Sequence, residues 1–128
     1  EARIINQKLS GNQIGDVKEL LLNLKNYGFD LISVTDGQNG AYAVENDGKI
    51  YKIGTLNPDG HEKIGAGDAY AGAFLASLTK GMSIAECMKR GVLNSIGVMS
   101  HVGAHTGQLT EAEMEHKASE IELSATQI

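Results

Sequence analysis

The sequence predicts a single α/β domain, and three observations carry that prediction. An amphipathic segment, 14–28, ends at Gly28 and leads at once into a short apolar run, 29–35; this order is the half-unit of an α/β fold. Two further runs, 41–45 and 49–55, flank Asn-Asp-Gly, a strong hairpin signal. Helical patterns follow, with no internal repeat, low-complexity tract or second domain.

The first elements are predicted from apolar spacing and glycine stops. Residues 1–11 predict a short helix closed by Gly11. The second helix has apolar or aromatic residues at helical intervals, namely Val17, Leu20, Leu21, Leu24 and Tyr27. The run 29–35 is apolar and β-branched at its end, which predicts a strand buried on both faces.

The later elements are helices that begin at recognisable caps. Small and apolar residues from Gly65 to Leu78 predict a helix that ends near Gly81. The next, within 82–101, starts with Ser83 as N-cap and Glu86 three residues on, which is a capping box. The last, within 109–123, repeats that spacing with Thr110 and Glu113. Turns or loops are expected at 36–40, 56–63 and 102–107.

Composition and charge narrow the class of protein. The chain has 128 residues, 41% of them hydrophobic, with a formal net charge of −5. An acidic chain lacks the basic face that nucleic-acid phosphates require, so we expect no nucleic-acid partner. The single cysteine, Cys87, excludes an internal disulfide and favours a reducing compartment. The N-terminus lacks a signal-peptide pattern and no apolar run could span a bilayer, so a cytoplasmic protein without membrane contact is expected.

The stretch Gly65-Ala66-Gly67-Asp68 places a carboxylate just behind a glycine turn, at the start of a helix. Gly60 and Gly65 have the spacing of a phosphate-binding P-loop, but Lys and Ser/Thr do not follow. A dinucleotide fingerprint fails as well, because Tyr70 stands where its third glycine belongs.

Two interpretations of Asp68 remain open. It can simply cap the helix, where carboxylates are favoured by unbonded N–H groups. Alternatively, Gly65, Ala66 and Gly67 expose backbone N–H groups as an anion site, and Asp68 accepts the proton of a hydroxyl that attacks a bound phosphate. The second interpretation predicts a phosphoryl-transfer site.

The pairing of two motifs resembles a known family. Thr-x-Gly-x-x-Gly at 35–40, followed by Gly-Ala-Gly-Asp at 65–68, is similar to the ribokinase-like (PfkB) family of carbohydrate kinases. The resemblance implies a three-layer α/β/α fold, of which residues 1–128 match the C-terminal, ATP-binding portion. The family's N-terminal sugar-binding half and small β lid are then absent, as one strand, a hairpin and three helices also suggest.

The resemblance implies a role for each matching residue. Asp68 corresponds to the catalytic base, and Gly65, Ala66 and Gly67 correspond to the anion hole. Contacts with the nucleotide are implied for Thr35, Gly37 and Gly40, whose glycines also suit a plain hairpin turn. Three residues of the helix within 82–101 fall in the region that walls the adenine pocket, although ordinary core is the alternative: Val92, Asn94 and Ile96.

Metal ions are implied as well. Glu1 corresponds to the last residue of a motif that organises Mg²⁺. A monovalent-cation site, K⁺ in many members, is implied for Glu62, Ile64, Val98, His101 and Gly103. The family usually has Asp-Thr where this chain has Glu62 and Lys63. A zinc site is not expected, because no zinc pattern matches His61, His101, His105 and His116.

The function implied is Mg-ATP-dependent phosphorylation of a hydroxyl on a sugar or sugar derivative, by an enzyme that forms a homodimer when intact. The alternatives are a nucleoside kinase of the same superfamily and a non-catalytic nucleotide-binding fragment. Because the substrate-binding half is missing, we expect the isolated chain to be inactive.

Overall fold

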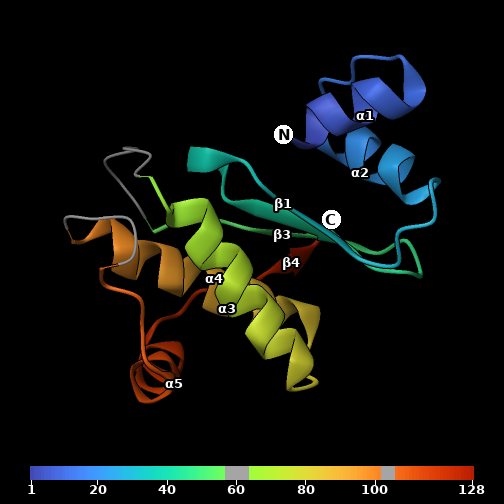
Figure 1. The fold of residues 1–128 in the computed structure, drawn as a ribbon. Coiled ribbons are helices and arrows are strands. Elements are labelled where there is room, and N and C mark those ends of the chain that lie inside the picture. Colours follow the sequence, from blue (N-terminus) through green and yellow to red (C-terminus); the bar gives the residue numbers. More distant parts are fainter. Residues whose placement is uncertain (57–63, 102–105) are drawn as a thin grey trace.

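The computed structural model of the chain describes residues 1–56, 64–101 and 106–128, and Figure 1 shows its arrangement. Two helices, α1 (Ala2–Ser10) and α2 (Val17–Lys25), lead into strand β1 (Ile32–Thr35). Strands β2 (Ala41–Val44) and β3 (Ile50–Ile53) form the predicted hairpin. Helices α3 (Ala66–Thr79), α4 (Ile84–Met99) and α5 (Glu111–Glu120) follow, and the chain ends with strand β4 (Thr126–Gln127).

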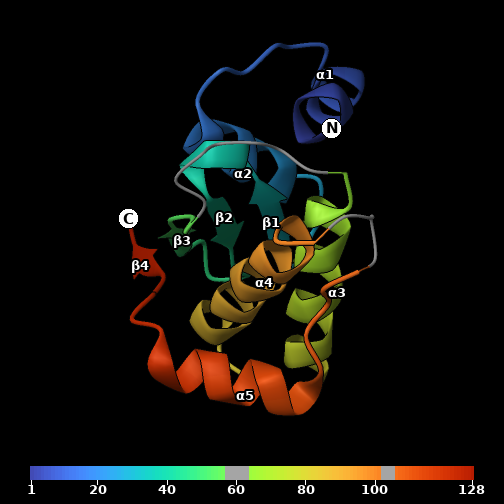
Figure 2. The same cartoon turned by 90° about the vertical axis from the view of Figure 1, so that its left-hand side faces the viewer.

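The four strands form one antiparallel sheet in the order β1-β2-β3-β4. Helices α1 and α2 lie on one side of it and α3 and α4 on the other, so the chain has three layers (Figure 1). Successive side chains of β2 point to opposite faces of the sheet. Ala41 and Ala43 pack toward α4, whereas Tyr42 and Val44 pack toward α2. Helix α5 lies across α3 and α4 at the end remote from α1 (Figure 2).

Two expectations about strands were wrong. The run 29–35 was expected to be buried on both faces, but every residue of β1 keeps some exposure, because among the described residues β1 pairs with β2 alone. Strand β4 was not anticipated: the last helix ends at Glu120, residues 121–125 have no regular secondary structure, and Thr126 then pairs with Lys52.

Helix starts follow the predicted caps. The Thr110 hydroxyl accepts the Glu113 N–H while the Glu113 carboxylate accepts the Thr110 N–H, which completes the capping box. At α4 only half of the box forms: Ser83 accepts the Glu86 N–H, but the Glu86 carboxylate pairs with Arg90. No described helix is long and apolar enough to cross a membrane.

Candidate active site

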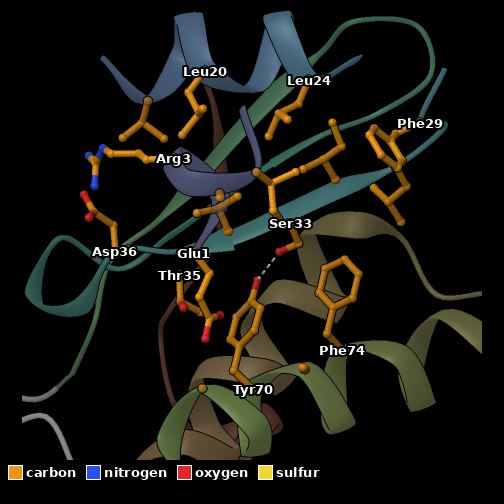
Figure 3. A pocket seen from close by; sticks show the side chains of 18 of the residues that line it. Glu1, Arg3, Leu20, Leu24, Phe29, Ser33, Thr35, Asp36, Tyr70 and Phe74 are labelled. Carbon is orange, nitrogen blue, oxygen red and sulfur yellow. Dashed lines mark hydrogen bonds between the residues drawn. The ribbon is translucent and has the colours of Figure 1, made fainter. Parts of the chain in front are cut away.

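A pocket of about 850 Å³ opens beside β1, between α1 and α2 on one side and α3 on the other (Figure 3). Five residues singled out from the sequence line it although they come from three separate segments of the chain. They are Glu1, Thr35, Gly65, Gly67 and Asp68. The fold therefore gathers the start of α1, the end of β1 and the start of α3 at one cavity.

The start of α3 differs from that of its neighbours. Side chains cap α2, α4 and α5, from Asp16, Ser83 and Thr110 respectively. Gly65 is the N-cap residue of α3, has φ 93° and offers no side chain. The left-handed backbone explains why glycine stands there. The first-turn N–H groups of α3 are thus left without a side-chain acceptor where Gly65 and Gly67 face the pocket.

Asp68 is not the N-cap residue. The helix already begins at Ala66, so Asp68 occupies its first turn, where the helix dipole still favours a carboxylate. Its side chain is exposed, and within the described residues it forms no hydrogen bond or ion pair. A carboxylate without a structural partner at the mouth of a pocket is available to accept a proton.

The turn after β1 explains the glycines of the first motif. Gly37–Asn39 form a short 3₁₀ turn, and the Asp36 N–H donates to the Gly40 carbonyl at 2.8 Å. Gly40 has φ 89°, and a Cβ there would collide with the carbonyl oxygen of Ile53. Gly40 is therefore required for the hairpin whatever it binds, and neither Gly37 nor Gly40 is among the residues that line the pocket.

The charges around the pocket are mostly acidic. Glu1, Asp36 and Asp68 line it, and Arg3 is the one cation among the described lining residues. Part of this charge is already engaged, because the Asp36 carboxylate accepts from Asn39 Nδ2 at 3.0 Å and Arg3 donates to the Gly15 carbonyl at 3.4 Å. The acidic side chains among the described lining residues therefore disfavour an anion that binds without a cation beside it.

The wall of the pocket contains a polar pair that the sequence did not reveal. The hydroxyls of Ser33 and Tyr70 lie 2.9 Å apart (Figure 3). Burial raises the pKa of Tyr70 to about 12, and its ring stacks on Phe74. The available signal was weak: Tyr70 follows the Gly-Ala-Gly-Asp motif by two residues, and Ser33 interrupts an apolar strand.

The three α4 residues implied for an adenine wall are buried or partly buried. Val92 is in the buried core, and Ile96 packs against that core. Asn94 is 7% exposed and bonded to Ala69 and Leu109. None of the three is among the residues lining the pocket, and their position agrees with the core alternative. Contact with adenine stays a prediction for them.

The residues assigned to a monovalent cation are only partly described. Glu62 and Gly103 lie outside the described residues. Ile64 is 88% exposed, whereas Val98 is buried and its carbonyl accepts the His101 N–H at 3.2 Å. His101 Nδ1 lies 2.9 Å from the Gly97 carbonyl. In the part of the chain that the structure describes, no three His, Cys, Asp or Glu side chains gather as a metal site.

The sequence pattern of the pfkB family of carbohydrate kinases matches residues 1–111. The chain belongs to the PfkB family. A 5-dehydro-2-deoxygluconokinase from Bacillus licheniformis is 30% identical over 101 residues, which are 79% of this chain and 31% of that protein. A cytidine kinase from Thermococcus kodakarensis is 28% identical over 89 residues, 69% of this chain and 32% of that protein. The chain thus spans about a third of each relative.

The fold agrees with this membership. A ribokinase from Thermotoga maritima superposes with a TM-score of 0.81 at 19% identity, over 94% of this chain and 40% of that one. The helices and the small antiparallel sheet are therefore part of a ribokinase-like fold, as expected from the two motifs.

Proposed function

We propose that this chain is the C-terminal, ATP-binding portion of a kinase that phosphorylates a hydroxyl of a sugar or sugar derivative, with Asp68 as general base. The observation that carries the proposal is the pairing of two features at one pocket. The N-cap residue of α3 provides no side-chain cap, and Asp68 makes no hydrogen bond or ion pair with any residue that the structure describes. The family membership supports phosphoryl transfer as the use of that pairing.

In the proposed reaction, Asp68 takes the proton of the attacking hydroxyl. The hydroxyl oxygen forms a bond to the γ-phosphorus of ATP, the bond to the bridging oxygen breaks, and ADP leaves. The N–H groups of Gly65, Ala66 and Gly67, at the positive end of α3, stabilise the negative charge on the transferred group. Thr35 and the turn with Gly37 and Gly40 border the nucleotide.

Mg²⁺ fits the oxygen ligands present. Glu1 offers an exposed carboxylate at the pocket, and carboxylates together with phosphate oxygens are the usual Mg²⁺ ligands. When bound, Mg²⁺ neutralises phosphate charge, which the acidic lining of this pocket makes necessary. Glu1 is therefore proposed to hold the ion together with the nucleotide.

The substrate class rests on the relatives. Similarity to a 5-dehydro-2-deoxygluconokinase favours a sugar or sugar-acid hydroxyl. Similarity to a cytidine kinase favours the alternative, a nucleoside. Turnover of a sugar panel against a nucleoside panel by the full-length kinase distinguishes the two.

The substrate-binding half is proposed to lie in further polypeptide that covers the β1 side of the pocket. Three large apolar side chains that line the pocket are exposed to solvent: Ile5 is 51% exposed, Phe29 48% and Leu75 57%. Relatives about three times as long as the matched segment are consistent with such a half. The 128-residue chain alone is then expected to show no ATP- and sugar-dependent turnover, and steady turnover by the purified chain would contradict this division.

The deciding experiment is Asp68→Asn in the full-length kinase, with the exposed Asp30→Asn as matched control. General-base catalysis contributes roughly 10²–10⁴ in rate, so kcat should fall at least about a hundredfold. Because Asp68 is not the N-cap, the melting temperature should stay near that of the wild type. ATP should bind as tightly or more tightly once a like charge is removed. Retained kcat in Asp68→Asn would remove the general base from the proposal.

K⁺ dependence tests the proposed cation loop separately. If Ile64, Val98, His101 and Gly103 present carbonyl groups to a monovalent cation with Glu62 nearby, K⁺ should raise the rate of the full-length kinase. Equal rates in K⁺ and in a tetraalkylammonium salt of the same ionic strength would contradict that site without affecting the role of Asp68.

A further inference from the structure

One face of α4 meets the first turn of α3 closely. Gly91, Asn94 and Ser95 share this face, because residues three and four apart lie on the same side of a helix. A Cβ on Gly91 would lie 2.6 Å from the ring carbons Cδ2 and Cε2 of Tyr70. Glycine at this position therefore lets α3 approach α4 just below Asp68.

Two side chains on that face donate hydrogen bonds into the first turn of α3. Ser95 Oγ donates to the Ala66 carbonyl at 2.8 Å, and Asn94 Nδ2 donates to the Ala69 carbonyl at 2.9 Å. The two acceptors stand on either side of Gly67 and Asp68 in the chain. The turn that carries the proposed base is thus held at both ends from α4.

Asn94 also connects this turn to the segment before α5. Its Oδ1 accepts the Leu109 N–H at 2.8 Å, so both polar atoms of the amide are used in a nearly solvent-free position. Close approach of the Gly97 and Gly107 backbones supports the same contact. Aspartate has a similar shape but no N–H donor, and leucine has neither a donor nor an acceptor. Of these three side chains, only asparagine can make both hydrogen bonds.

We propose that Asn94 and Ser95 are positioning residues, which fix the height and orientation of the Gly65–Asp68 turn relative to the rest of the molecule. The catalytic consequence rests on the proposed function. A reacting group displaced by about 1 Å can lose about a hundredfold in rate, so the two bonds matter for kcat more than for ATP binding. Neither residue needs to touch substrate for this role.

The test compares Ser95→Ala with Ser100→Ala in the full-length kinase. Ser100 donates to the Ile96 carbonyl four residues back, and Ser95 Oγ likewise lies 3.1 Å from the Gly91 carbonyl, but no hydrogen bond joins Ser100 to α3 in the described part of the chain. Ser95→Ala should lower kcat several-fold with KM for ATP unchanged, and Ser100→Ala should change neither. Hydrogen exchange at the Ala69 amide, which donates to the Gly65 carbonyl at 2.9 Å, should accelerate in Ser95→Ala alone. Equal behaviour of the two variants would overturn the proposal.

A double-mutant cycle separates positioning from general structural damage. Asn94→Asp should lower kcat about ten- to a hundredfold in the wild-type background, because the carboxylate cannot donate to Ala69. In an Asp68→Asn background it should cost little more, since the base that it positions is already gone. Losses that multiply in the double variant would overturn the role of Asn94.

The tests of Asn94 and Ser95 can fail or succeed independently of the Asp68→Asn test of the proposed function. If Asp68→Asn keeps its kcat, the general base is wrong, while hydrogen exchange in Ser95→Ala still decides whether α4 holds the turn. If Asn94→Asp does not fold, the comparison of Ser95→Ala with Ser100→Ala decides alone.

Discussion

The two faces of the sheet are covered by different means. On the α4 side, nine buried residues from the sheet, α3 and α4 form one apolar cluster, whereas the cluster on the α2 side has three, among the residues described. Helix α1 contributes to neither cluster, and its Ile4, Ile5 and Leu9 are 58%, 51% and 47% exposed.

Hydrogen bonds from polar side chains hold α1 in position instead. Buried Asn6 accepts from Asn23 Nδ2 at 2.6 Å and donates to the Asn12 carbonyl at 3.2 Å. Hydrogen bonds fix orientation but add little net stability, about 1 kcal/mol each, whereas burial of apolar side chains contributes several times more. The difference teaches that apolar burial stabilises the α3–α4 layer, whereas hydrogen bonds hold α1 and leave its apolar side chains exposed.

The largest expected effect is a difference in the free energy of unfolding between a variant on α4 and a variant on α1. Met88 on α4 is fully buried, so Met88→Ala should lower the free energy of unfolding by about 2–5 kcal/mol. Ile5→Ala on α1 removes a half-exposed side chain and should change it by no more than about 0.5 kcal/mol. Denaturant titration of the chain measures both, and similar losses would mean that the layers are equally packed.

The sequence could predict elements that depend on neighbouring residues, but not those that depend on contacts between distant segments. Gly11, Ser83 and Thr110 cap helices through bonds within a few residues, so these helix ends were located correctly, whereas α2 ends at Lys25, before the expected stop at Gly28. Strand β4 was missed because its pairing with β3 is made by residues far apart in sequence.

The candidate site divides in the same way. The helix start at Gly65–Asp68 could be predicted because it depends on neighbouring residues, whereas the roles assigned to these residues stay predictions. The hydrogen bonds of Asn94 to Ala69 and Leu109 could not be predicted, because only the packed structure brings these residues together; its contact with adenine stays a prediction. Ser33 and Tyr70 were missed for the same reason, since a strand and a helix meet there.

Replacing either of two glycines by alanine tests how closely α3 and α4 are packed. Gly91→Ala forces a Cβ against Tyr70, whose ring is stacked on Phe74, so overpacking should cost about 1–3 kcal/mol. Gly72, on the exposed face of α3, has no atom within 4 Å of an added Cβ. Gly72→Ala should therefore raise stability by about 0.5–1 kcal/mol through helix propensity. Thermal unfolding of both variants checks the sign, and a stabilised Gly91→Ala would show that the helices can separate.

Tyr70→Phe probes the polar link between the layers. It removes the hydroxyl bonded to Ser33 and should cost about 1 kcal/mol at neutral pH, with the exposed Tyr27→Phe as control. Burial raises the pKa of Tyr70 from 10.0 to about 12. The neutral phenol is thus favoured in the fold, so its contribution is complete below pH 10 and is lost as the pH rises toward 12. Alkaline unfolding should shift upward in Tyr70→Phe, and an unchanged midpoint would contradict the buried phenol.

The smallest effect concerns the ion pairs and the cap of α5, which act beside its one buried apolar side chain, Met114. Arg90 on α4 pairs with Glu115 at 2.6 Å, and Lys80 at the end of α3 pairs with Glu111 at 2.6 Å. The hydrogen bond from Lys80 lowers the pKa of Glu111, and the Thr110 N–H lowers that of Glu113. Both carboxylates are exposed, so each contribution is small.

The sign of the pH dependence follows from these directions. A lowered folded-state pKa means that the contribution is present above the ordinary value of 4.5 and is lost as the pH falls below it. α5 should therefore loosen in acid before the α3–α4 core unfolds, and hydrogen exchange along α5 measured from pH 6 to pH 3 should report it. Glu113→Gln can keep the capping box without the charge, so it should flatten the acid response while retaining the helix. An acid response unchanged in both Glu113→Gln and Glu111→Gln would place its origin outside α5.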